Sequence, residues 1–383
     1  MAKLLRHCLP LFNKIAPLNL AEDWDQVGLQ VGDPEQLISQ ALLTIDLTPS
    51  VLREATEQGC ELIIAYHPPM FRPLERLTWG GQTSWKQSTL LEAVRRGIAV
   101  YSPHTALDAA EDGMNDWLCA GIGQGTTQPI SPRSTQTADT FKIVTYAPKA
   151  DADLIREALD RGGAGWIGNY RQCTFNSPGE GTFQPNDGAN PSIGQIGQLT
   201  RVEEVRIEMI CSGDRLPSAL ASLREKHPYE EPAIDVLKLE AGSSGLTQPP
   251  VPTGAGRLLT LDEPIDPTLL TTRLKRRLIL PSIKLGLPQT SRPIRTVAVC
   301  VGAGGSLFAD AASTHQIDAY VTGEMQHHQA LDLIESGAAV ALTGHTHSER
   351  PYLPVYAERL NEIFGEGITW SVSRADRAPL ELV

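Results

Sequence analysis

A short block near the C-terminus carries the densest group of potential metal ligands in the chain. Residues 344–349, Gly-His-Thr-His-Ser-Glu, place two imidazoles and a carboxylate within five positions, directly after the apolar run 338–342. If a helix forms here, His345 and Glu349 are four residues apart and face the same way. Nitrogen and carboxylate donors at the end of a strand are what a first-row divalent metal needs. One block cannot complete a coordination sphere, so further ligands must come from elsewhere.

Three more clusters of histidines and carboxylates follow predicted strands. In α/β sheets, functional groups gather just beyond the C-terminal ends of the strands. Together with the first block, these clusters contain six of the nine histidines. A lone histidine at a strand end is usually an ordinary hydrogen-bonded residue, and spacing alone leaves that interpretation open beside a shared metal site. The clusters are His67 after 62–66, His104 and Asp108 after 98–102, and Glu324, His327 and His328 after 319–321.

The segments between these clusters predict sheets covered by helices. Apolar strands alternate with helical segments up to about residue 130, and again from about residue 255. We expect a single α/β domain made from 1–130 and 255–383, which brings the strand ends together. Strands are expected at 41–47, 62–66, 98–102, 296–301, 319–321 and 338–342, and helices at 50–58, 88–96, 266–277, 306–313 and 326–336.

The middle region, 138–242, follows a different order. Its pattern is the βαββαβ order of ferredoxin-like domains. The polar stretches 123–140 and 242–256, rich in Gly, Ser, Thr and Pro, are expected to be linkers. The predicted fold is therefore a discontinuous α/β metal-binding domain built from both chain ends, with an inserted ferredoxin-like domain. Strands of the insert are expected at 141–147, around 170–175 and 181–183, at 205–211 and at 233–239, with helices at 151–161 and 216–227.

Composition restricts the classes of partner. The chain has 383 residues, 41% of them hydrophobic and 20% charged, as in soluble globular proteins. Its net charge of −12 argues against a surface that wraps nucleic acid. No apolar stretch is long enough to span a membrane. Six scattered cysteines without close pairs are typical of reduced thiols, so we expect a cytoplasmic protein.

A glycine run joins a predicted strand to a predicted helix at residues 301–306, Val-Gly-Ala-Gly-Gly-Ser. Backbone amides in such a turn can hold an anion. A tight turn without any ligand is the more common use of so short a run. Both interpretations stay open from the sequence.

Five segments occur in a recognisable series along the chain. They are 21–29 (Ala-Glu-Asp-Trp-Asp-Gln-Val-Gly-Leu), 66–69 (Tyr-His-Pro-Pro), 102–108 (Ser-Pro-His-Thr-Ala-Leu-Asp), 322–328 (Thr-Gly-Glu-Met-Gln-His-His) and 344–349. In this order they resemble the family of GTP cyclohydrolase I type 2 homologues, also described as Ngg-one-interacting-factor-like proteins. The resemblance covers essentially the whole chain. Residues 227–232, His-Pro-Tyr-Glu-Glu-Pro, resemble the middle module of three-part members, which is related in fold to PII and CutA signalling proteins.

The resemblance implies a dinuclear metal site. The family's pattern, carried over residue by residue, makes His67, Asp108, His345 and Glu349 the ligands, with Glu349 as the bridge. The cofactors implied are divalent ions, Zn, Mn or Fe, one or two per subunit. The resemblance also implies a homohexamer.

This chain departs from the family pattern at one position. Many members have two adjacent histidines where this chain has Tyr66 and His67, a form similar to that of eukaryotic-type members. The departure bears on the second metal position. The Tyr66 hydroxyl could contact a ligand without binding the metal itself. The nitrogen that the absent histidine would have provided could come instead from His104, His327 or His328.

Two functions follow as hypotheses. The first is a metal-dependent hydrolase in which the ion lowers the pKa of a bound water, with Glu349 and His104 as candidate catalytic residues and His347 as an alternative proton carrier. Its substrate is a small molecule; if the family name is literal, that is GTP, whose imidazole ring opens with loss of formate. The second is a non-catalytic metal-binding scaffold or regulator whose insert binds an effector or partner. An open coordination position would separate the two.

Overall fold

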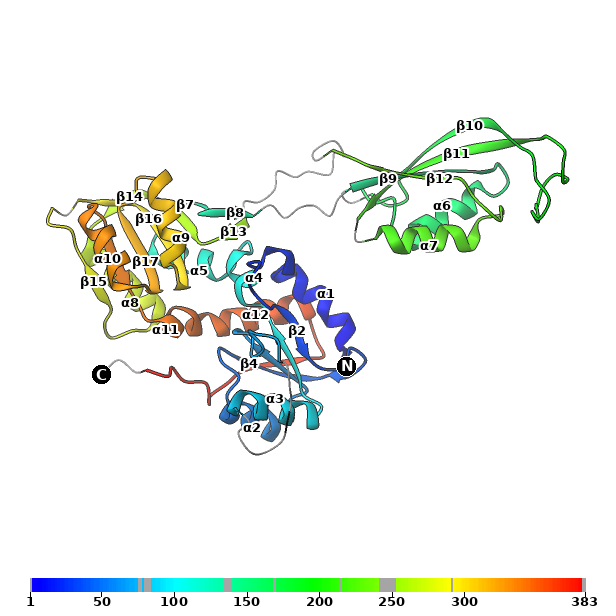
Figure 1. Cartoon of the computed structure of the whole chain (residues 1–383). Coiled ribbons are helices and arrows are strands. Elements are labelled where there is room, and N and C mark those ends of the chain that lie inside the picture. The colour runs from blue at the N-terminus through cyan, green and yellow to red at the C-terminus, as the bar shows by residue number, and fades with distance from the viewer. Residues whose placement is uncertain are drawn as a thin grey trace. The chain divides into compact units, whose positions relative to one another are not determined.

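The computed structural model divides the chain into two compact units of mixed α/β structure (Figure 1). The first unit comprises Met1–Ser134 and Val251–Val383, and the second comprises Thr135–Pro250. Among the described residues, no helix combines the length and apolar character that crossing a membrane requires. All six cysteines are free thiols. The described residues are 2–74, 78, 84–133, 140–167, 170–213, 215–240, 253–290 and 292–380.

The first sheet of the first unit has the strand order β19-β4-β5-β6-β2. Its four strands other than β2 run parallel, and all residues of β5 and β6 are buried, as expected for apolar strands covered on both faces. Helices α2 and α3 pack on one face through an apolar cluster. The bounds are β2 (Gly28–Val31), β4 (Gln40–Thr44), α2 (Pro49–Glu57), β5 (Leu62–Ala65), α3 (Trp85–Arg95), β6 (Ala99–Ser102) and β19 (Thr369–Val372).

The second sheet has the order β15-β18-β17-β16-β14-β7, with a parallel centre of β18, β17 and β16. Helices α9 and α10 cover its outer face through a separate apolar cluster. The bounds are β7 (Gly125–Gln128), β14 (Arg257–Ile265), β15 (Lys284–Gly286), β16 (Ile294–Ala303), α9 (Gly305–Thr314), β17 (Ala319–Glu324), α10 (His327–Glu335) and β18 (Ala339–Leu342).

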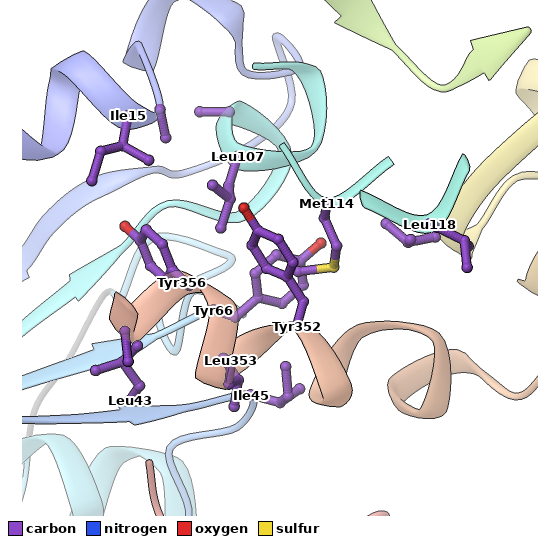
Figure 2. Close-up of a cluster of buried hydrophobic side chains, with 14 of the residues drawn as sticks. Ile15, Leu43, Ile45, Tyr66, Leu107, Met114, Leu118, Tyr352, Leu353 and Tyr356 are labelled. Carbon is purple, nitrogen blue, oxygen red and sulfur yellow. The ribbon is translucent and has the colours of Figure 1, made fainter. Parts of the chain in front are cut away.

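One hydrophobic core joins the two sheets of the first unit. It contains side chains from both sheets and from α1, α5, α8 and α12. Figure 2 shows part of this core, where Tyr66 lies among Ile45, Leu107 and Tyr352. Because the segments before and after the insert share this core, neither can bury its sheet alone. The bounds are α1 (Leu5–Ile15), α4 (His104–Ala109), α5 (Met114–Ile122), α8 (Pro267–Leu278), α11 (His345–Glu349) and α12 (Leu353–Phe364), with short pieces β1 (Lys3–Leu4), β3 (Leu37–Ile38), η1 (Leu18–Leu20) and η2 (Arg350–Tyr352).

The second unit contains one antiparallel sheet with the order β10-β11-β9-β12. Alternate residues such as Ile207 and Met209 point to a core formed with α6 and α7, which lie on one side of the sheet (Figure 1). The bounds are β9 (Thr140–Pro148), α6 (Ala152–Arg161), β10 (Thr174–Phe183), β11 (Thr200–Ser212), α7 (Leu216–Lys226) and β12 (Ile234–Lys238).

Three sequence-based assignments were wrong. The predicted linker 123–140 contains strand β7 and strand β8 (Ser131–Arg133), and the predicted linker 242–256 contains β13 (Thr253–Ala255), which pairs with β8. Residues 134–139 and 241–252 lie outside the described residues. The strand pieces expected around 170–175 and 181–183 are replaced by one edge strand, β10, which begins only at Thr174 and runs to Phe183. It tolerates Pro178 because only one side of it is paired.

A buried arginine ties the strands next to the insert to α4 and α5. Arg257, 2% exposed, donates to the Asp116 carboxylate at 2.6 Å and to four main-chain carbonyls. We expect Arg257→Met to lower the free energy of unfolding by about 3–5 kcal/mol, because Asp116 and the carbonyls lose their partner. Denaturant unfolding beside the exposed-site control Arg295→Met tests this; equal loss in both variants would contradict it.

Candidate metal centre

The C-terminal block forms a short helix immediately after β18. Gly344, with φ of +88°, turns the chain, and α11 begins at His345. As predicted, His345 and Glu349 lie on one face, with His345 Nε2 3.4 Å from Glu349 Oε1. The Glu349 side chain is only 2% exposed, whereas His345 is about one-third exposed. A buried carboxylate is therefore presented to a more open imidazole.

His67, which follows β5, completes a possible metal-binding triad with His345 and Glu349. One ligand atom from each residue lies within 4.8 Å of the others. His67 Nε2 is 3.5 Å from Glu349 Oε2, and the rings of His67 and His345 are 5.5 Å apart. A tetrahedral ion that holds its ligands at about 2.0–2.2 Å separates them by roughly 3.3–3.6 Å. The two imidazole–carboxylate separations match that requirement.

Each of the three imidazoles at the site has a carboxylate on its Nδ1 atom. A carboxylate can only accept a hydrogen bond, so Nδ1 must donate and Nε2 of the neutral ring is left for a ligand. Metal-binding histidines are typically oriented by such carboxylate partners. The pairs are His67 with Asp46 at 3.0 Å, His104 with Asp25 at 2.8 Å, and His345 with Glu324 at 3.0 Å.

The buried Glu349 carboxylate lacks a partner for one of its oxygens. Oε2 has no hydrogen bond among the described residues, and its approach to His67 Nε2 is an ion-pair distance without hydrogen-bond geometry. An unpaired buried carboxylate oxygen is costly unless a cation or proton compensates it. Burial lowers the pKa of His67, but Asp46 and Glu349 outweigh burial and raise that pKa to about 10. The site therefore attracts positive charge, and a divalent ion fits it.

Asp108, the fourth ligand implied by the resemblance, lies outside this triad. Its carboxylate accepts a 2.6 Å hydrogen bond from the Tyr66 hydroxyl. Burial raises the pKa of Asp108 to about 8, partly opposed by the Tyr66 hydrogen bond. Burial and the Asp108 charge also raise the pKa of Tyr66 well above its ordinary value. The role of Asp108 as a ligand stays a prediction.

His104 is placed beside the triad by a strained start of α4. Its φ is +29°, an unfavourable value for a residue with a side chain, and such strain is commonly kept at functional sites. Its ring lies 5.4 Å from that of His67. Burial alone would raise the pKa of Asp25, but hydrogen bonds from His104 and Thr105 outweigh it and lower that pKa. Asp25 therefore stays an acceptor that orients His104.

One cavity of about 620 Å³ in the first unit is lined by the triad and by Tyr66, His104 and Asp108. The glycine run forms part of its wall, and Gly302, with φ of +65°, passes close to the triad. A Cβ atom there would lie 2.7 Å from Glu349 Oε1 and 3.4 Å from His345 Nε2. Trp24 and Phe71, 55% and 46% exposed with ring centres 5.7 Å apart, also line the cavity.

The remaining histidines of the predicted clusters lie elsewhere. His327 and His328 are exposed on α10, and among the described residues they do not line this cavity. They are therefore not placed to supply the missing nitrogen. His347 packs back against Gly344 and does not line the cavity either, so the structure gives no support to its role as a proton carrier.

Sequence reasoning overlooked the carboxylates that orient the imidazoles. Asp46 lies two residues beyond the end of β4, but the strand was expected to run to residue 47, so the strand-end rule that located the histidines did not reach it. Asp25 lies in the family segment 21–29, and Glu324 lies in the cluster with His327 and His328. Their hydrogen bonds to His104 and His345, however, join residues that are 79 and 21 positions apart in the sequence. No local pattern reports such contacts.

Fold and site together define a class: a mixed α/β protein whose imidazole–carboxylate cluster lies at the ends of parallel strands from two sheets. The chain belongs to the Duf34/NIF3 (NGG1p interacting factor 3) family, which matches residues 4–379. The sequence-based resemblance is thus confirmed.

Similar proteins span nearly the same length. A protein of Halalkalibacterium halodurans named GTP cyclohydrolase 1 type 2 homolog is 35% identical over 88% of this chain and 87% of its own. NIF3-like protein 1 of Rattus norvegicus is 34% identical over 99% of this chain and 93% of its own. The crystal structure of a Bacillus cereus protein related to NIF3 has a TM-score of 0.74 and 30% identity, and all of both chains is covered.

Proposed function

We propose that this protein is a metal-dependent hydrolase whose ion is held by His67, His345 and Glu349. The observation that carries the proposal is the buried Oε2 of Glu349, which has no hydrogen-bond partner among the described residues and belongs to a carboxylate flanked by two imidazoles that other carboxylates orient. When bound, a divalent ion would supply Lewis acidity. Such an ion can lower the pKa of a bound water molecule to about 7. Three protein ligands leave a position open, as in catalytic rather than structural sites.

His104 is the proposed proton-transfer residue. Asp25 holds its Nδ1, which leaves Nε2 to take or give a proton. The 5.4 Å separation between the His104 and His67 rings places it beside the ligands but outside the triad. Its role is therefore separable from metal binding.

The aromatic residues of the cavity indicate a planar substrate. Large aromatic side chains are usually buried, yet Trp24 and Phe71 are about half exposed and adjacent. They offer a face on which a flat ring can stack. The name GTP cyclohydrolase 1 type 2 homolog, carried by relatives, agrees with a purine nucleotide. We therefore propose a nucleotide-like substrate, with GTP as the first compound to test.

Activity should depend on the two proposed roles in different ways. With Mn²⁺ or Zn²⁺ added, a screen of nucleotides and phosphoesters should find turnover that Glu349→Gln abolishes. His104→Ala should retain its metal content but lose about 10²–10⁴-fold in kcat, the usual contribution of general acid–base catalysis. Activity that survives in Glu349→Gln would point to a contaminant and contradict the proposal, and loss of metal in His104→Ala would contradict the separate role.

A second candidate function is regulation through the insert. The second unit has its own cavity of about 660 Å³, where Tyr229 donates a 2.5 Å hydrogen bond to Glu204 and lies 6.0 Å from the Phe183 ring. This cavity, together with the ferredoxin-like order β9-α6-β10-β11-α7-β12, supports an effector-binding module. A protein that binds metal fully but converts no tested compound would favour this alternative. The homohexamer stays a prediction, which the mass in solution would test.

A further inference from the structure

The number of ions per chain depends on two residues beside the triad, Tyr66 and Asp108. Both line the same cavity as Glu349 and His67, and Asp108 lies close enough to interact electrostatically with each of them. A second ion next to Glu349 would need ligands from this side of the cavity. The Tyr66 hydroxyl instead donates its only proton to Asp108 Oδ1 at 2.6 Å.

Tyr66 is held firmly in that position. Its side chain is 2% exposed and packs in the hydrophobic core with Leu107 and Tyr352 (Figure 2). Its backbone N–H donates to Thr44 at 2.9 Å, and its carbonyl accepts from the Ser102 hydroxyl at 2.8 Å. Moving the phenol away from Asp108 would disturb the core and the end of β5. The hydrogen bond is therefore part of the fold and not a passing surface contact.

The chemistry of this pair does not favour a divalent ion. The Tyr66 hydroxyl directs its proton to Asp108 and so offers only a neutral oxygen, whereas imidazole and free carboxylate are the usual ligands of Zn, Mn and Fe. Asp108 already shares one oxygen with Tyr66. His104 also lines this cavity, but among the described residues its ring nitrogens are not part of the group of ligand atoms that lie within 4.8 Å of one another.

We propose that this chain binds one divalent ion, at His67, His345 and Glu349, and that the Tyr66–Asp108 pair fills the adjacent position that a second ion would need. This inference rests on the proposed metal site. It assigns Tyr66 a role in setting the metal count: a histidine at this position would supply a nitrogen and release Asp108.

Counting metal in four proteins tests the inference. Each protein is loaded with excess Zn²⁺ or Mn²⁺ and dialysed, and the number of metal ions per chain is measured by inductively coupled plasma mass spectrometry. We expect one ion in the wild type and in Tyr66→Phe, and two in Tyr66→His. Asp108→Asn keeps the size of the side chain and should also retain one ion, bound more weakly because a negative charge close to Glu349 and His67 is lost. Circular dichroism verifies that each variant is folded.

The outcomes separate the inference from the proposal beneath it. If the wild type binds no ion, the proposed metal site itself is contradicted. Two ions in the wild type, with His104 or Asp108 as an added ligand, would overturn the inference and leave the metal site standing. One ion in a folded Tyr66→His variant would overturn it too, as would loss of the ion in Asp108→Asn. If Tyr66→His does not fold, the wild-type and Asp108→Asn counts decide.

Discussion

Replacing Glu349 with glutamine is expected to weaken metal binding by at least about 100-fold, because even residues behind the ligands contribute about 10–100-fold and Glu349 is a direct ligand in our account. The amide has nearly the shape of the carboxylate but no charge, so it leaves the fold intact. Glu349 is 2% exposed and its Oε2 has no hydrogen bond among the described residues. Titration calorimetry with Zn²⁺ or Mn²⁺ measures the change in affinity.

A matched control is available in the same unit. Glu335 ends α10, is exposed and does not line the cavity, so Glu335→Gln removes the same charge at a distance from the triad. We expect its metal affinity to equal that of the wild type. If both variants bind metal as the wild type does, Glu349 is not a ligand.

Replacing Gly302 with alanine is the second change with a large expected effect. The new Cβ would lie 2.7 Å from Glu349 Oε1, a separation that real Cβ contacts do not show, so the carboxylate must move. Because the Glu349 side chain is buried in the first turns after β18, it has little room to move aside, and we expect metal affinity to fall about 10–100-fold, as for displaced supports of metal ligands. The positive φ of Gly302 adds a loss of about 1–2 kcal/mol in the free energy of unfolding.

Gly337→Ala separates the two effects of that change. Gly337 also has a positive φ, +96°, but a Cβ there meets nothing within 4 Å in the part of the chain that the structure describes. It should therefore lose a similar amount of stability and bind metal normally. Metal affinity and denaturant unfolding are measured on both variants. Equal metal affinity in the two would show that the Glu349 carboxylate does not need the space left by the missing side chain at Gly302.

The sequence predicted much of the first unit because its central strands are continuous apolar runs with clear ends. Strands β5, β6 and β18 were located to within a residue or two, and each is followed by one of the histidines now found together. Helical spacing also placed His345 and Glu349 on one face correctly. Strand ends and helix periodicity are local features, which a single sequence records well.

Features that depend on pairing over long distances were not predictable in the same way. All four residues of β7 are exposed, so the strand has no hydrophobic pattern and exists through its pairing with β14. The hydrogen bond from Tyr66 to Asp108 joins residues 42 positions apart, and nothing in either motif indicates it. The resemblance supplied a ligand set, but only the three-dimensional arrangement shows which of those residues share contacts.

We propose that His67, His345 and Glu349 bind one ion together. The most direct measurement is anomalous X-ray scattering from crystals of the protein grown with Zn²⁺ or Mn²⁺. We predict one strong peak per chain, about 2.0–2.2 Å from His67 Nε2, His345 Nε2 and a carboxylate oxygen of Glu349. Fully loaded crystals with no peak among these three side chains would contradict the account.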